Sequence, residues 1–268
     1  MLWTLARRSL TQGRFVMLGV LIVVTSIQII IVGQAAAIEH TRGFSRMAEF
    51  VPAFLQRGLG TRALLLASFQ GTVAFGYFHP VVAVLVSVLA IYFATEPAHE
   101  VESHLVDLTL ARSVPRHLVI TRAMMLAVLL VVIATALMGA GTQVGLLLFA
   151  EPSFAAPPAG RAALMLTHLA AVAICFGAFA LAVAAGARRW LTAFATAAFT
   201  VVILYLIDFL AIGWPLMRTI AWISPFHYYD GLGILAGDAA PGRDLTILLS
   251  TAVAFVVVAY VRFNRRDL

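Results

Sequence analysis

A charged segment, residues 96–122, stands between two long apolar runs and gathers side chains able to bind a charged partner. It reads EPAHEVESHLVDLTLARSVPRHLVITR and holds four of the twelve acidic residues and three of the eighteen arginines. Charges at this density set the position and orientation of a docked partner through electrostatic complementarity. We therefore interpret the segment as the place where a soluble partner acts on the chain.

An apolar stripe runs along the same segment. Val101, Leu105 and Leu108 fall at i, i+4 and i+7, on one face of a short helix. Helices that dock into a groove combine such anchors with charges at the rim. The candidate contact residues beside the stripe are Glu96, Glu100, Glu102, Asp107, Arg112 and Arg116. The spacing fits a solvated helix on the membrane surface equally well, and by itself does not choose between the two.

Three polar residues inside apolar runs are candidates for a translocation path: Gln28, His168 and Asp208. A carboxylate in lipid is costly and marks a functional candidate. Asp208 lies near the end of its run, so it fits an interfacial residue as well as one that faces a pore or pairs with another helix. Gln28 and His168 more often hydrogen-bond a neighbouring helix than bind a substrate.

Catalytic and metal-binding patterns are not recognisable in the sequence. Residues 227–230, HYYD, lack the spacing of metal ligands, and aromatic residues are expected at a membrane interface. The absence of lysine excludes a phosphate-loop lysine and a Schiff base. No histidine pairs with an evident nucleophile. We predict a chain that is not an enzyme, has no metal site and binds no cofactor itself.

Composition defines the class of protein. Of 268 residues, 62% are hydrophobic and 11% charged, whereas about a quarter are charged in soluble domains. Apolar runs of about twenty residues recur, each long enough to cross a hydrocarbon core. Because every backbone amide must be satisfied within lipid, the spans should be helices. The prediction is a single all-α membrane domain that contacts lipid.

Six spans are expected, at about 15–38, 78–95, 120–149, 162–187, 190–212 and 244–263, with a connecting segment at 96–118. The third is longer than a bilayer requires, so it should tilt or project into water. Between the first two spans, Arg57 and Arg62 interrupt an apolar stretch. We expect a helix lying in the interface over 50–77, with a seventh span as the alternative.

Arginine distribution gives the orientation. With the N-terminus inside, the inner segments carry eleven arginines and the outer ones seven. Short cytoplasmic segments are the ones enriched in basic residues. We expect both termini and the charged segment to be cytoplasmic. The run after Arg7 and Arg8 is longer than the core of a signal peptide, about 7–15 residues, so it should be a retained anchor.

The charged segment resembles that of the type-2 ATP-binding-cassette (ABC) exporter permeases. An acidic pair, an L-x-x-L run and a Pro/Arg ending occur in the family's order, at Glu100, Glu102, Leu105, Asp107, Leu108, Leu110, Ala111, Arg112, Val114 and Arg116. Ser103-His104 replaces the family's Gly-Thr, and Ser113 stands at the family's proline, with Pro115 following. Residues 222–237 and 262–268 resemble the outer loop and the C-terminal ending of the same family.

The resemblance implies a permease that works as a dimer with cytoplasmic ATPase subunits, which bind ATP and Mg²⁺. The helix between spans two and three would enter a cleft of the ATPase and transmit its closure. We expect an exporter of apolar or amphipathic substrates in a bacterial inner membrane, with no nucleic-acid partner. The alternative is a membrane anchor or scaffold that tethers a soluble partner without transport.

Overall fold

The computed structural model describes residues 2–44, 65–103 and 115–266, and every regular element in these ranges is a helix. Six helical segments in them are long and apolar enough to cross a membrane. They are Arg14–His40, Phe69–Glu102, His117–Phe149, Ala159–Ala184, Trp190–Ala211 and Pro241–Asn264. The predicted all-α architecture with six spans is confirmed.

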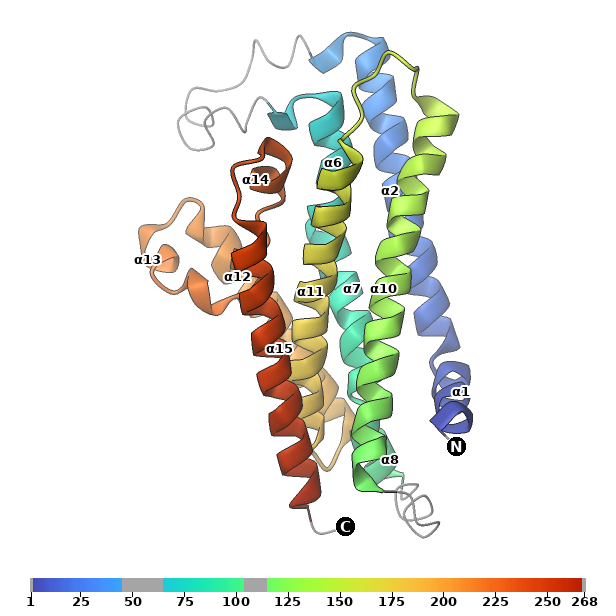
Figure 1. Ribbon diagram of the computed structural model, residues 1–268, viewed down its shortest axis with the longest axis vertical. Coiled ribbons are helices and arrows are strands. Elements are labelled where there is room, and N and C mark those ends of the chain that lie inside the picture. Colours follow the sequence, from blue (N-terminus) through green and yellow to red (C-terminus); the bar gives the residue numbers. More distant parts are fainter. Residues whose placement is uncertain (1, 45–64, 104–114, 267–268) are drawn as a thin grey trace.

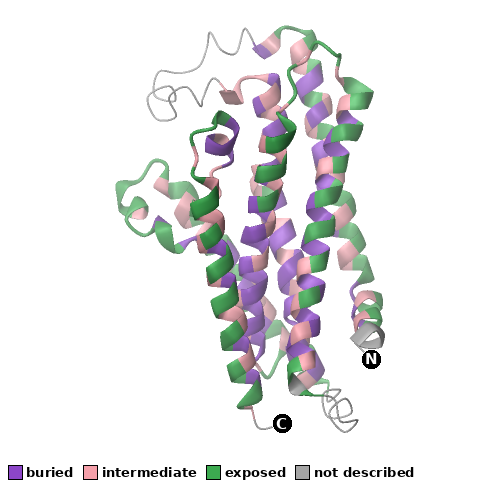
Figure 2. Ribbon diagram, in the orientation of Figure 1, coloured by how far each residue is buried: buried purple, intermediate pink, exposed green. Residues whose placement is uncertain are grey.

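Two helices, α7 (Pro80–Ala94) and α11 (Ala159–Ala184), form the centre of the bundle. Around them stand α2 (Arg14–His40), α10 (Arg116–Phe149), α12 (Trp190–Ala211) and α15 (Pro241–Asn264), with α2 along α10 and α15 along α11 (Figure 1). Buried residues concentrate on the central pair and the inner side of α10 (Figure 2). Small residues permit this close approach: a Cβ on Gly177 would lie 3.2 Å from that of Ala90.

Span two consists of three consecutive helices, α6 (Phe69–Phe78), α7 and α8 (Glu96–Glu102). The first break falls at His79-Pro80, because proline lacks an amide hydrogen and disfavours a helical residue before it. The His79 ring caps the new helix, accepting a hydrogen bond from the Val81 amide at 3.3 Å. The second break falls at Thr95, whose hydroxyl bonds back to the Ile91 carbonyl at 2.9 Å. Pro97 then occupies the first turn of α8.

The predicted interfacial segment over 50–77 is wrong in its last part. Residues 69–77 belong to α6, which is continuous with span two and contacts α2. Phe69 and Tyr77 are buried in the bundle. The reason is local: this stretch carries no charge, and Gly76 lets α6 approach Gln28 of α2 closely. Residues 45–64, with Arg57 and Arg62, lie outside the described residues, as does the alternative of a seventh span there.

The predicted excess length of span three agrees with α10, which has 34 residues and begins at Arg116 rather than at 120. At 1.5 Å per residue it is about 51 Å long, against a hydrocarbon core of about 30 Å. Its first turns therefore extend beyond the hydrocarbon region or the helix tilts. The start of α10 lies beside α8, at the end of the bundle where the N- and C-termini also lie (Figure 1).

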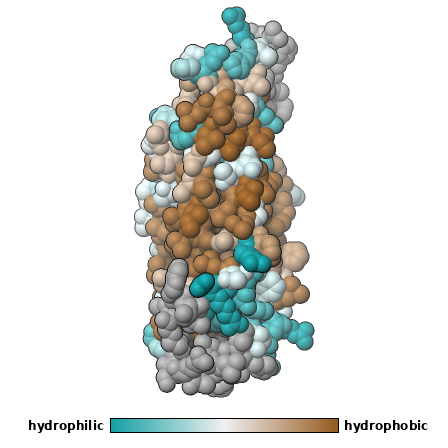
Figure 3. Space-filling model, turned by 90° about the vertical axis from the view of Figure 1, so that its right-hand side faces the viewer, coloured by the Kyte–Doolittle hydropathy of each residue, from teal (hydrophilic) through white to brown (hydrophobic). Residues whose placement is uncertain are grey.

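Exposed apolar side chains cover the outer helices. Phe15 on α2, Leu147 on α10, Phe199 on α12 and Val253 on α15 are 75%, 86%, 69% and 62% exposed. Figure 3 shows the face formed by α2 and α10 as a broad apolar surface with hydrophilic atoms toward both ends. This is the pattern of a surface that faces lipid across the middle and water at the ends.

The connection between α12 and α15 folds back on the bundle. It contains α13 (Pro215–Arg218), two short 3₁₀ turns, η1 (Ala221–Ile223) and η2 (Pro225–Tyr228), and α14 (Gly231–Ala236). Ser224 fixes it to span five by donating to the Leu204 carbonyl at 2.9 Å. Tyr229 fixes it to span two by donating to the Tyr77 carbonyl at 3.1 Å.

The α2–α10 contact gives a test of the packing. A Cβ on Gly145 would meet the Val32 side chain at 2.8 Å, whereas nothing lies within 4 Å of a Cβ on Gly19. We expect Gly145→Leu to destabilise the bundle by about 1–3 kcal/mol through overpacking. Gly19→Leu, the matched control on α2, should unfold at the wild-type temperature. Thermal unfolding in an uncharged detergent measures both, and equal midpoints would contradict this packing.

Candidate functional site

The described part of the charged segment is α8, which continues span two beyond the Thr95 bend. Val101 on α8 is half-buried and packs against the core. The other predicted contact residues Leu105, Asp107, Leu108 and Arg112 lie outside the described residues. The structure therefore describes the two ends of the charged segment. They are α8 at its beginning and the first turns of α10 at its end.

Arg122, six residues into α10, joins these two sides. Its Nη1 donates to Oε1 of Glu100 at 2.9 Å, and its Nη2 lies 3.7 Å from Oε2 of Glu96. The guanidinium side chain is 2% exposed and the two carboxylate side chains 12% and 5%. Ser9 on α1 (Leu2–Gln12) adds a hydrogen bond to Glu96. A buried ion cluster thus holds α8, α10 and the N-terminal helix together.

Glu96 and Glu100 correct one part of the sequence interpretation. They were expected among the charges at the rim of a docking helix, yet both point inward to Arg122. The physical reason is that a guanidinium removed from water needs an opposite charge nearby, and α8 is the element within reach. These two residues position the segment rather than present a surface for a partner.

Glu102 is exposed, in contrast to Glu96 and Glu100. Its carboxylate accepts a hydrogen bond from the backbone amide of Trp190 at 2.8 Å. Trp190 is the first residue of α12, where an amide has no partner within the helix and an anion is favoured. The Trp190 ring nitrogen also donates to Thr95 at 3.1 Å. Span five is thereby tied to α8 as well.

The ion cluster is not internally balanced. Two carboxylates share one guanidinium, so it carries one excess negative charge if all three groups are ionised. Four of its buried atoms have no hydrogen-bond partner among the described residues: Oε2 of Glu96, Oε2 of Glu100, and Nε and Nη2 of Arg122. Buried polar groups are normally satisfied by protein or water. The cluster is therefore a place where water or a further ligand atom is needed.

Sequence reasoning did not assign a role to Arg122, Ser9 or Trp190. A signal for Arg122 was present, because it falls inside the predicted span at 120–149, and an ionisable residue within a span is by default a functional candidate. Ser9 and Trp190 carried no such signal, since their contacts join elements far apart in the sequence.

Asp208 lies in a second site, about 27 Å further along α12 from Trp190. Its Oδ1 is 3.5 Å from Nδ1 of His227 in η2, and the two side chains are 29% and 47% exposed. Both line an open cavity of about 570 Å³ between α12 and the folded-back connection, together with Arg218 and Asp230. The sequence had left Asp208 between a pore-facing or helix-pairing role and an interfacial one; the structure places it in a largely apolar cavity that is open to the surface.

The aromatic residues beside that cavity are structural. Burial, and secondarily Tyr77, raise the pKa of Tyr229, so its hydroxyl stays protonated and donates to the Tyr77 carbonyl. Asp230 caps α14 by accepting from the Gly233 amide at 2.8 Å. Within the described residues, no group of three or more His, Cys, Asp or Glu is arranged to hold a metal ion.

Gln28 and His168 are buried between helices. The Gln28 amide donates to the Val73 carbonyl of α6 at 3.2 Å. The His168 ring lies 2.8 Å from the Leu164 carbonyl and 3.1 Å from that of Pro241, where α15 begins. These contacts are those of residues that fix helix packing. The structure does not bring them together with Asp208.

No model of a known protein family matches the chain. No curated protein is significantly similar to it.

The ion cluster predicts an unequal response to arginine removal. Arg122→Gln leaves two buried carboxylates without a counter-charge and should destabilise the protein by about 3–5 kcal/mol. Arg243→Gln, at a side chain 72% exposed, is the matched control and should change stability by less than about 0.5 kcal/mol. Thermal unfolding in detergent compares them. Adding Glu100→Gln to Arg122→Gln should restore part of the loss; equal midpoints for the two arginine variants would refute the cluster's role.

Proposed function

We propose that the chain is the membrane-spanning permease subunit of an ABC exporter. It would move an apolar or amphipathic substrate out of the cytoplasm, driven by ATP hydrolysis on partner ATPase subunits. ATP and Mg²⁺ would bind to those partners, since this lysine-free chain offers no phosphate-loop lysine. A second permease protomer would complete the pathway.

The observation that carries the proposal is the attachment of the charged segment to the bundle. Glu96 and Glu100 before residues 104–114, and Arg122 after them, form one buried cluster. Glu102 ties the start of span five to α8 through the Trp190 amide, and Ser9 ties α1 to the cluster through Glu96. A force applied to the segment would therefore reach four elements at once, as an ATP-driven coupling element requires. A passive tether needs no such attachment.

The arginine distribution supports a cytoplasmic location for this end of the bundle. Both termini and α8 lie at this end, and it is the end that carries the arginine excess (Figure 1). A bacterial inner membrane fits the composition. ATP is available on that side, where a soluble ATPase would meet the segment.

The weakly buried outer helices support a dimer. In the most apolar windows of α12 and α15, 17% of residues are buried within the chain, against 67% for α11. Their exposed faces have the composition to pack against a second protomer or against lipid. The cavity at Asp208 adjoins α12.

Cysteine labelling tests the topology. With Cys175 replaced by Ala, Ser103→Cys beside α8 should react with a membrane-impermeant maleimide only from the cytoplasmic side. Ser153→Cys, in the exposed connection at the opposite end, should react only from the outside. Labelling of intact cells and of inverted vesicles distinguishes the two. The reverse pattern would place α8 outside, away from ATP, and would sink the proposal.

Coupling is tested with an ABC ATPase subunit from the source organism that co-purifies with this chain, reconstituted with it in liposomes. Wild type should hydrolyse ATP faster when amphipathic fluorescent dyes are added and should transport them. The double variant Glu100→Ala/Glu102→Ala should still bind the ATPase but lose dye stimulation, because α8 loses its short contact to α10 and its bond to the first amide of α12 and is held to Arg122 by Glu96 alone. Glu151→Ala, at an exposed site at the opposite end, is the control. An ATPase that binds but never responds to the dyes would favour the anchor.

A further inference from the structure

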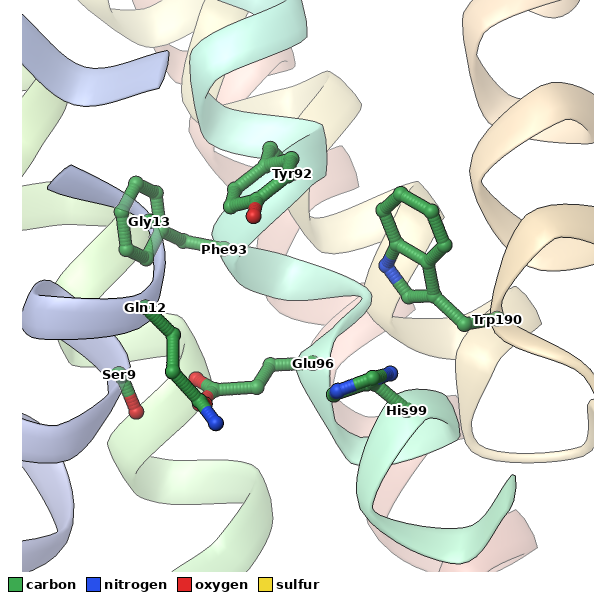
Figure 4. A pocket seen from close by; sticks show the side chains of 8 residues that line it. All are labelled: Ser9, Gln12, Gly13, Tyr92, Phe93, Glu96, His99 and Trp190. Atoms are coloured by element: carbon green, nitrogen blue, oxygen red, sulfur yellow. The ribbon is translucent and has the colours of Figure 1, made fainter. Parts of the chain in front are cut away.

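A small cavity lies beside the ion cluster, between the N-terminal helix and the junction of α7, α8 and α12 (Figure 4). Its volume is about 150 Å³, well below the roughly 300–1,000 Å³ of sites for drug-sized ligands. This volume has room for a small group rather than for a large substrate. Its lining includes Ser9, Gln12, Tyr92, Glu96, His99 and Trp190.

Aromatic rings form a fixed wall of this cavity. Tyr92 and Trp190 pack edge to face with their centroids 5.9 Å apart, and His99 lies 6.2 Å from Trp190. The indole nitrogen is held by Thr95 and the Trp190 backbone amide by Glu102. The wall is therefore built before any ligand arrives, which lowers the entropy lost on binding.

The opposite side of the cavity carries the carboxyl group of Glu96. Glu96 shares Arg122 with Glu100, which takes the short 2.9 Å contact. Arg122 Nη2 is 3.7 Å from Glu96 Oε2, and this oxygen has no hydrogen-bond partner in the part of the chain that the structure describes. Figure 4 shows the hydroxyl of Tyr92 directed to the same space.

A carboxylate opposite an aromatic wall selects a particular kind of ligand. Ring faces attract cations, and most strongly those that are weakly hydrated. One carboxylate is too few for a bound metal ion, which takes several oxygen ligands. An anion would be repelled by Glu96. We propose that this cavity binds a small alkylammonium group at the junction of the N-terminal helix with spans two and five.

Two sources of this chemistry are open to the site. A free quaternary or primary ammonium compound would enter from water. The ammonium of a lipid headgroup would enter from the membrane surface, which α1 adjoins at this end of the bundle. Occupation by either would connect α1 to α8 and α12 through one ligand.

Binding is tested on the purified chain in an uncharged detergent, without any ATPase, so that the result is independent of the transport proposal. Choline and its neutral isostere 3,3-dimethylbutan-1-ol are titrated at constant ionic strength and followed by saturation-transfer NMR. Choline should bind with a dissociation constant of about 1 mM, and the isostere at least about tenfold more weakly. Equal binding of the two, or none of choline, would overturn the proposal.

Two variants locate the site. Glu96→Gln should weaken choline binding about tenfold or more, because it removes a buried charge partner. Tyr92→Leu should weaken it about threefold or more by removing the ring face. Glu151→Gln and Phe199→Leu are the controls for charge and for aromatic area, at exposed sites elsewhere. Unfolding midpoints check that each variant is folded; wild-type binding by a folded Glu96→Gln or Tyr92→Leu would contradict the assignment.

Nanodiscs separate the two sources. In discs of phosphatidylglycerol alone, choline should bind as it does in detergent. If phosphatidylethanolamine in the disc displaces choline, the occupant is a lipid headgroup. If choline binds equally in discs with and without phosphatidylethanolamine, the site takes a free ammonium compound. Absence of choline binding in phosphatidylglycerol discs would count against the site itself.

Discussion

The constraint on which this end of the structure depends is the cost of burying the Arg122 guanidinium. An arginine six residues into a membrane-spanning helix must have opposite charges close by. Glu96 and Glu100 supply them from α8, and this requires the chain to turn at Thr95 and bring α8 against α10. The position of α8 therefore follows from one electrostatic requirement.

That requirement also explains why several elements meet at this end. Once α8 is held, Glu102 reaches the start of α12, and Ser9 brings in the N-terminal helix. The cluster has more acid than base and leaves buried atoms without partners. A cluster that is both well packed and incompletely satisfied is suited to change with its surroundings. The proposed coupling element and the proposed alkylammonium site both lie at this junction.

The two polar sites of the bundle differ in kind. At Asp208 the groups are partly exposed and lie in an open cavity, so solvent screens their interaction and its contribution to stability should be small. At Arg122 the groups are desolvated, so removing one of them should be costly. Asp208 thus lies beside His227 in contact with solvent, while Arg122 has a structural role in joining α8 to α10.

The sequence by itself determined the helical class, the number of spans among the described residues and most of their bounds, because lipid leaves the backbone few alternatives and apolar runs are legible locally. It missed the extension of span two through residues 69–77. The arginines at 57 and 62 suggested an interfacial helix for the whole stretch, but residues 69–77 themselves carry no charge and join span two. Only the tertiary structure decided that Glu96 and Glu100 turn inward to Arg122, that His227 meets Asp208, and that Trp190 joins α8. These pairings depend on which helix faces are opposed, and a linear pattern of residues does not contain that information.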